Sequence, residues 1–363
     1  QPDPKPDDTP TEPLQSLDLP VRIALPVQID LLTWGDTPNA QLQHLKARYN
    51  YNGSQHQLQL LGLDYPLNGA DSAPAQLHAQ VQLQGAAPMQ LKGSVQASLP
   101  APPQIEQPIT VDTLASITGT LAGKNAQLQL RAHARALHPD EVAARAQAVP
   151  PKTIDVGTAA EADETAGLNA HIQATIRPWQ TQPLPEAQAR FKQLNLALLT
   201  AALPPSDIHG QVRIHTDDQG LWSVQAELDN ALAGAWDQGA LPLRHLQARA
   251  QQSGAHWLLE ELLLQLPGND GGQLQAQGRF DTQQHTLEAQ LQLEQINPQR
   301  ALASLPRQSI SGRLEAQADA DQQVQFTLNL QPDQPTSAPG LRQARAQGQW
   351  QAPLLQLHDI AID

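Results

Sequence analysis

The chain has 363 residues, a formal net charge of −14, no cysteine and one methionine. The acidic balance excludes nucleic acid as an expected partner because it repels phosphate backbones, and the lack of cysteine excludes disulfides and cysteine-ligated metals. Hydrophobic residues make up 40% of the chain and charged residues 16%, so the chain is expected to fold. Aromatic residues make up only 3%, which makes a wide, dense core hard to build.

Residues 1–18 are rich in proline and aspartate and are expected to form a loop or linker. From residue 19 to residue 363, apolar residues alternate with glutamine or other polar residues, the pattern of strands with one apolar and one solvated face. One-sided strands are typical of antiparallel sheets, and turn signals such as Asn52-Gly53 separate them. The sequence therefore predicts an all-β fold: an elongated antiparallel meander, curled into an open groove, with a few short helices.

The alternation assigns a largely aliphatic set of residues to the apolar face, and these are the candidate lining of the groove. They are Leu77, Val81, Leu83, Leu128, Leu130, Ile172, Ile176, Val212, Ile214, Val224, Leu228, Leu274, Leu291, Leu293, Leu314, Phe326 and Leu328. No apolar run approaches the ~20 residues that a membrane-spanning helix needs.

A module of roughly one hundred residues recurs along the chain. Asn195, Leu203, Pro204, Ile208 and Gly210 return 102 residues later as Asn297, Leu305, Pro306, Ile310 and Gly312. The approximate modules are 19–137, 166–240 and 241–363, with a helical and loop insert at 138–165.

Short helices are expected at three places in the chain. Asn297 can cap a helix that begins at Pro298 and is stopped by Pro306, and a similar segment from Leu196 is stopped by Pro204-Pro205. A third helix is expected over Pro139 to Ala148, where acidic residues occupy the first turn.

The sequence offers no reaction centre, so we expect neither catalytic residues nor a cofactor nor a metal site. The twelve histidines lack metal-ligand spacing and are expected on solvent-facing strand positions, as for His133. The pair Glu260-Glu261 interrupts an apolar run and is expected to mark a bulge or a strand end, because neighbouring strand residues point to opposite faces. The six tryptophans are expected to close ends of the sheet rather than to form a sugar-binding platform.

Several segments resemble the middle region of the TamB family, the inner-membrane subunit of the translocation and assembly module of Gram-negative bacteria. The most specific pieces are Arg177-Pro178-Trp179 and Ala235-Trp236-Asp237-Gln238 with Leu241-Pro242-Leu243. The resemblance covers most of residues 19–363. It implies an open groove with an aliphatic lining, as in AsmA-like and bridge-like lipid transfer proteins. It also implies an inner-membrane anchor and an Omp85-type outer-membrane partner, both through regions outside this chain.

The resulting hypothesis is a periplasmic segment that carries phospholipid acyl chains between the inner and outer membranes. The alternative function is a scaffold or chaperone for the assembly of outer-membrane proteins or autotransporters, which would pair with the edges of the sheet. A third possibility, an adhesive β-repeat, has no support in the TamB-like segments. For the fold, the alternative is a closed sandwich or barrel whose apolar face is its own core, although such a core would normally contain more aromatic residues.

Overall fold

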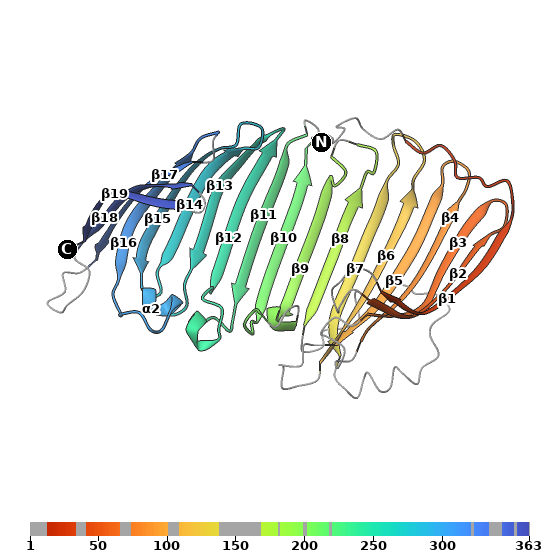
Figure 1. The fold of residues 1–363 in the computed structure, drawn as a ribbon, viewed down its shortest axis with the longest axis horizontal. Helices are drawn as coiled ribbons and strands as arrows, with labels where there is room; N and C mark the ends of the chain where they lie inside the picture. The colour runs from red at the N-terminus through yellow and green to blue at the C-terminus, as the bar shows by residue number, and fades with distance from the viewer. Residues whose placement is uncertain are drawn as a thin grey trace. The chain divides into compact units, whose positions relative to one another are not determined.

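The structure is a computed structural model that describes residues 13–33, 41–65, 74–100, 109–137, 168–180, 182–198, 202–217, 220–320, 323–333, 343–351 and 354–362. It is an all-β protein of nineteen strands in an open sheet, as predicted (Figure 1). The chain divides into two compact units, unit 1 (Gln1–Gln188) and unit 2 (Ala189–Asp363). The insert at 138–165 and the helix expected from Pro139 lie outside the described residues.

Unit 1 contains eight complete strands, and each pairs antiparallel with the next one along the chain. The strands are β1 (Ile23–Thr33), β2 (Gln41–Tyr51), β3 (Gln55–Tyr65), β4 (Ala75–Gln84), β5 (Gln90–Pro100), β6 (Thr110–Thr120), β7 (Leu128–Leu137) and β8 (Asn169–Ile176). Strand β9 (Glu186–Leu194) contains the boundary between the units.

Unit 2 continues the antiparallel meander with ten strands. They are β10 (Ile208–Thr216), β11 (Trp222–Asn230), β12 (His245–Ser253), β13 (His256–Gln265), β14 (Gln273–Asp281), β15 (Thr286–Ile296), β16 (Ile310–Ala318), β17 (Val324–Pro332), β18 (Ala344–Gln351) and β19 (Leu354–Ile362). The described helices are the 3-10 helices η1 (Leu196–Leu198) and η2 (Trp236–Gln238) and the α-helix α2 (Pro298–Ala301).

The internal repeat is visible in unit 2 as two similar helix-to-strand connections. The side chain of Asn297 accepts a hydrogen bond from the backbone N–H of Gln299 and so caps α2, as the sequence predicts. Asn195 accepts one from Ala197 in the same way at η1. The helices end at Ala301 and Leu198, before the prolines expected to stop them.

One cluster of buried residues in unit 1 lies where β2 and β4 end and β3 begins. Tyr51 is only 1% exposed, and its hydroxyl accepts a hydrogen bond from the backbone N–H of Leu19. His56 stacks on Tyr51, and its Nε2–H donates to the carbonyl of Leu17 at 2.6 Å. The segment before β1 therefore closes this end of the sheet, and Leu17, which falls in the expected linker, takes part in it.

In unit 2, the longer connections between strands are joined to one another. The carboxylate of Asp270 pairs with the guanidinium of Arg300, whose Nε lies 2.7 Å away. Asp237 in η2 accepts hydrogen bonds from the backbone N–H groups of Ala303 and Ser304, at 2.7 and 2.8 Å. These contacts link the connection after β11 to the connection after β15, so they close one edge of the unit, here called the connection rim.

Replacement of Gly210 by alanine should destabilise unit 2 strongly. Gly210 has a φ of +147°, and a Cβ there would lie 2.1 Å from the carbonyl oxygen of Glu227 on the neighbouring strand. Gly254, with a φ of +58° and open space around its Cα, is the matched control. We expect Gly254→Ala to cost about 1 kcal/mol and Gly210→Ala at least about 3 kcal/mol in chemical denaturation. Equal losses of unfolding free energy in the two variants would show that the close approach of β10 and β11 at Gly210 adds nothing to the cost.

Unit 2 should lose stability when the pH falls below about 4. The backbone N–H groups of Ala303 and Ser304 hold the pKa of Asp237 below its ordinary value of 3.8. Because the pKa of Asp237 is lower in the folded than in the unfolded protein, its carboxylate stabilises the fold fully above the unfolded pKa. This stabilisation is lost as the pH falls through the folded pKa. The melting temperature should therefore fall less between pH 7 and pH 3 in Asp237→Asn than in the unmodified protein. Asp359→Asn, at an exposed position of β19, should leave that shift unchanged.

Candidate functional site

The strand register of unit 2 aligns apolar residues into continuous rows that cross the sheet from strand to strand. Row 1 consists of Gly210, Leu228, Leu246, Leu264, Leu274, Leu293, Gly312, Leu330 and Ala344. Row 2 consists of Val212, Ala226, Ala248, Leu262, Ala276, Leu291, Leu314, Leu328, Ala346 and Ile360. Row 3 consists of Ile214, Val224, Ala250, Leu259, Gly278, Ala289, Ala316, Phe326, Gly348 and Leu357. No polar residue interrupts these three rows.

A fourth row lies at the opposite end of the strands from row 1 and is rich in aromatic residues. Row 4 consists of Thr216, Trp222, Gln252, Trp257, Phe280, Leu287, Ala318, Val324 and Trp350. It borders the short connections between β10 and β11, β12 and β13, β14 and β15, and β16 and β17. This edge is here called the hairpin rim.

The apolar face of unit 2 is partly exposed rather than packed into a core. Every residue of rows 1 to 3 in β10 to β17 has an intermediate exposure, neither buried nor fully exposed. On β19, Leu357 is 46% exposed and Ile360 is 53% exposed. Side chains held between two sheets would be almost completely buried. Among the described residues, this face is therefore the uncovered side of a single layer, which the closed-sandwich alternative does not explain.

Unit 1 carries a similar set of rows on one face. Row A contains Ile23, Tyr51, His56, Leu83, Leu91, Gly119, Leu128 and Ile176; row B contains Leu25, Tyr49, Leu58, Val81, Gly93, Ile117, Leu130 and Ala174; row C contains Val27, Ala47, Leu60, Ala79, Val95, Ala115, Ala132 and Ile172. A shorter row continues with Leu77, Ala97, Thr113, Ala134 and Ala170. Leu58 is 46% exposed and Ile172 is 39% exposed, so this face too is open in places.

The opposite face of unit 2 is polar, and charged side chains on it form ion pairs with one another. Arg279 on β14 pairs with Glu288 on β15, and Arg313 pairs with Glu315 within β16. Glutamine side chains also bond across strands, as Gln277 donates to Gln290 at 3.1 Å. Such a face stays in water without a strong net field, which leaves the apolar face as the unusual surface.

The two glutamates in the apolar run of β13 form a bulge, as predicted. The register between β13 and β14 shifts between Leu259 and Leu262, so Glu260 and Glu261 together span one position of β14. Both glutamates are exposed. The extra residue returns Leu262 to the apolar face, in row 2.

All seventeen residues predicted to line the groove lie in these rows. Leu83, Leu128 and Ile176 are in row A, Val81 and Leu130 in row B, Ile172 in row C, and Leu77 in the shorter row. Leu228, Leu274 and Leu293 are in row 1, Val212, Leu291, Leu314 and Leu328 in row 2, and Ile214, Val224 and Phe326 in row 3.

Sequence reasoning left out two parts of this surface. Leu262 and Leu264 were not assigned, because β13 is apolar on both sides of its bulge and simple alternation gives no face there. The aromatic row was also missed as a unit, although Trp222, Trp257 and Trp350 do lie at an end of the sheet as expected for tryptophans. Its only sequence signal is that each aromatic residue stands next to a hairpin.

The expectation that the strand histidines face solvent is wrong for two of them. His133 lies on the polar face as predicted but is only 6% exposed, because its ring stacks on His171 at 4.5 Å and its Nε2 bonds to Asn169. His56 lies in row A and is 7% exposed. Both positions depend on pairings between distant segments that alternation alone does not reveal.

Within the part of the chain that the structure describes, no group of three or more histidine, aspartate or glutamate residues could hold a metal ion. The same residues include no helix with the length and apolarity needed to cross a membrane. Comparison with protein-family models, with curated proteins and with solved structures finds no match to this chain.

The folded protein should bind a hydrophobic dye such as anilinonaphthalene sulfonate at neutral pH, with enhanced fluorescence. The rows form a continuous apolar surface that is partly exposed, and exposed apolar surface binds such dyes. Unfolding in urea should abolish the signal together with the β-sheet circular dichroism. A folded chain that leaves the dye fluorescence unchanged would show that the rows are covered in solution.

Proposed function

We propose that this chain is a non-enzymatic, periplasmic segment of a TamB-like lipid conduit, whose apolar faces bind phospholipid acyl chains and carry them between the inner and outer membranes. It would thereby support outer-membrane biogenesis. The observation that carries the proposal is the continuity of rows 1 to 3, which cross nine or ten strands without a polar residue and which, apart from Gly348, are at least partly exposed.

The energetic reason for such a face is the cost of moving an acyl chain through water. Each CH₂ group exposed to water costs about 0.8 kcal/mol, so one acyl chain costs on the order of 10 kcal/mol. Contact with an aliphatic surface removes much of this cost. Because the surface is apolar at every strand, a chain that moves along the rows meets no point where the cost returns.

The uniformity of the rows favours movement over fixed binding. A site that holds one ligand usually places a few polar groups to fix its orientation. Rows 1 to 3 offer only Leu, Ala, Val, Ile, Gly and one Phe, so every position presents nearly the same dispersion contacts. The rows therefore support solvation of an acyl chain without a preferred stopping place.

The dimensions of unit 2 suit an acyl chain. Four rows at every second residue span about 20 Å along the strands, and ten strands span on the order of 40 Å across them. Half of a bilayer hydrocarbon core is about 15 Å thick. An acyl chain thus fits within the width of the rows.

The resemblance to the TamB family supports the cellular setting of the proposal. It suggests association with the inner membrane and with an Omp85-type outer-membrane partner. The alternative role, a scaffold for assembling outer-membrane proteins, would use the hydrogen-bonding edges of the sheet. That role does not account for a continuous apolar face across the interior strands, so the lipid conduit is the better explanation.

Leu291→Asp should lower the amount of phospholipid that copurifies with the protein by more than half. The substitution places a charge in the middle of row 2, where burying it against acyl chains is strongly unfavourable. Lipid is measured by mass spectrometry of organic extracts from purified protein. The same variant should transfer lipid between vesicles at least about tenfold more slowly, because a barrier of 1.4 kcal/mol already gives that factor.

Gln290→Asp is the matched control, because Gln290 is the neighbouring residue on the same strand and is exposed on the polar face. It should retain the lipid content and transfer rate of the unmodified chain. Circular dichroism and thermal melting check that both variants are folded. Normal lipid content and transfer in folded Leu291→Asp protein would refute the conduit.

A further inference from the structure

Four of the seven aromatic residues of unit 2 lie at one edge of the apolar face, whereas Trp236 lies in η2 at the opposite edge. Rows 1 to 3 contain one aromatic residue, Phe326, whereas row 4 contains three tryptophans and one phenylalanine. Trp222 and Trp257 meet edge to face at 6.2 Å. Trp257 is also the register partner of Phe280 on β14.

These aromatic side chains are not fully explained as packing anchors. Phe280 is 39% exposed and Trp350 is 47% exposed, so a large part of each ring lies free on the surface of the described protein. A residue whose role is to close a core would be buried like Tyr51, which is 1% exposed. The exposed rings point to a contact with something outside the chain.

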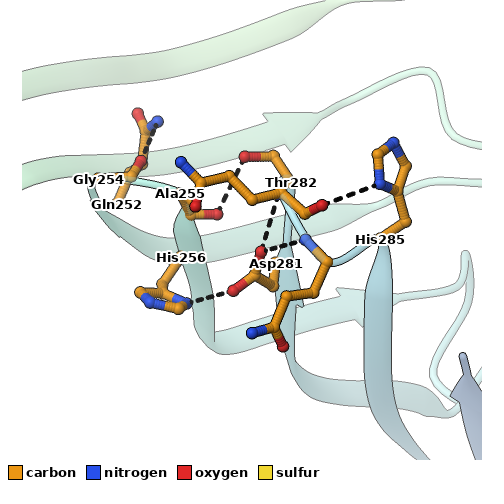
Figure 2. Close-up of polar contacts among 9 residues, drawn as sticks. Gln252, Gly254, Ala255, His256, Asp281, Thr282 and His285 are labelled. Carbon is orange, nitrogen blue, oxygen red and sulfur yellow. Dashed lines mark hydrogen bonds and ion pairs between the residues drawn. The ribbon is translucent and has the colours of Figure 1, made fainter. Parts of the chain in front are cut away.

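The connections beyond row 4 form a polar and exposed edge. Figure 2 shows two of them held together, with the N–H and hydroxyl of Thr282 donating to the carbonyl of Ala255 and His256 paired with Asp281 at 2.9 Å. The backbone N–H groups of Gln284 and Gln283 keep the pKa of Asp281 low, so its carboxylate is charged at neutral pH. Across this edge the surface passes from aliphatic rows, through an aromatic row, to charged turns.

The opposite edge of unit 2 has a different character. Row 1 ends against the connection rim, where Ile208 and Leu266 are 5% and 8% exposed, and where α2 lies (Figure 1). Asn230 and Asn297 are buried there as well, at 4% and 3% exposure. This edge also carries exposed apolar residues, namely Leu232, Trp236, Leu302 and Leu305, but it has one aromatic residue where the hairpin rim has four.

The order aliphatic, aromatic, charged is the order found across the boundary of a bilayer. Tryptophan is enriched where hydrocarbon meets head groups, because its ring is largely apolar while its N–H requires a polar partner. The same chemistry suits the glycerol ester region of a phospholipid whose acyl chains lie on the rows.

We propose that phospholipid lies on unit 2 in one orientation, with its acyl chains on rows 1 to 3, its ester region against the aromatic residues of row 4, and its head group in water at the hairpin rim. This inference rests on the proposed function and adds a direction to it. The connection rim is then the side toward which the acyl chain ends point.

The absence of cysteine allows a direct test with single labels. Ala318→Cys places a bimane fluorophore in row 4, and Ala344→Cys places one in row 1; both alanines are partly exposed. Each labelled protein is loaded from phosphatidylcholine vesicles that contain lipid with a nitroxide either next to the ester or near the end of the acyl chain. Because nitroxides quench only nearby fluorophores, the pair of labels reports the direction of the bound lipid.

We expect the ester-proximal nitroxide to quench more than half of the fluorescence of the row 4 label and clearly less of the row 1 label. The chain-end nitroxide should give the opposite order. Trp350→Leu in the Ala318→Cys background keeps the site apolar and should weaken this preference if the aromatic ring holds the ester region.

Equal quenching of both labels by both lipids, or the reverse order, would overturn the orientation while leaving lipid binding intact. Absence of quenching by either lipid would instead show that no lipid occupies the face, which contradicts the proposed function itself. Circular dichroism confirms that the labelled proteins are folded before loading.

Discussion

The register between neighbouring strands is the constraint on which the apolar surface depends. Side chains of a strand alternate between the two faces, so a shift of one residue would move the apolar residues of that strand to the polar side. In unit 2 the register holds through ten strands, and the bulge at Glu260 and Glu261 corrects the phase where β13 would otherwise fall out of step. The rows are therefore a product of many local pairings rather than of one central core.

A single layer with an open face must find its stability elsewhere. In unit 1 buried residues lie at both ends of the strands, with Tyr51, His56 and Met89 at one end and Ala75, Val111 and Leu137 at the other, and in unit 2 Leu266, Asn230 and Asn297 lie at the connection rim. The ends of the strands thus supply the buried contacts that a second sheet would supply in a sandwich. This division leaves the middle of each face uncovered and accounts for the partial exposure of its leucines and alanines.

Much of the fold could be predicted from the sequence because its signals are local. Alternation showed the one-sided strands, Asn297 followed by Pro298 showed the helix start, and Glu260-Glu261 showed the bulge. The predictions were wrong or incomplete where segments far apart in the sequence come together. The burial of His133 against His171, the aromatic row and the bonds from Asp237 to Ser304 all depend on which strands lie side by side, and no local pattern carries that information.

The bonds of Asp237 also decide how unit 2 can deform. They tie two connections that are separated by four strands, while Thr282 and His256 tie only adjacent hairpins at the other edge. Strands β12 to β15 therefore resist spreading where Asp237 holds them and yield more easily at their far ends. Under the proposed function, a widening of the face for a bulkier or kinked acyl chain would therefore occur at the hairpin rim rather than at the connection rim.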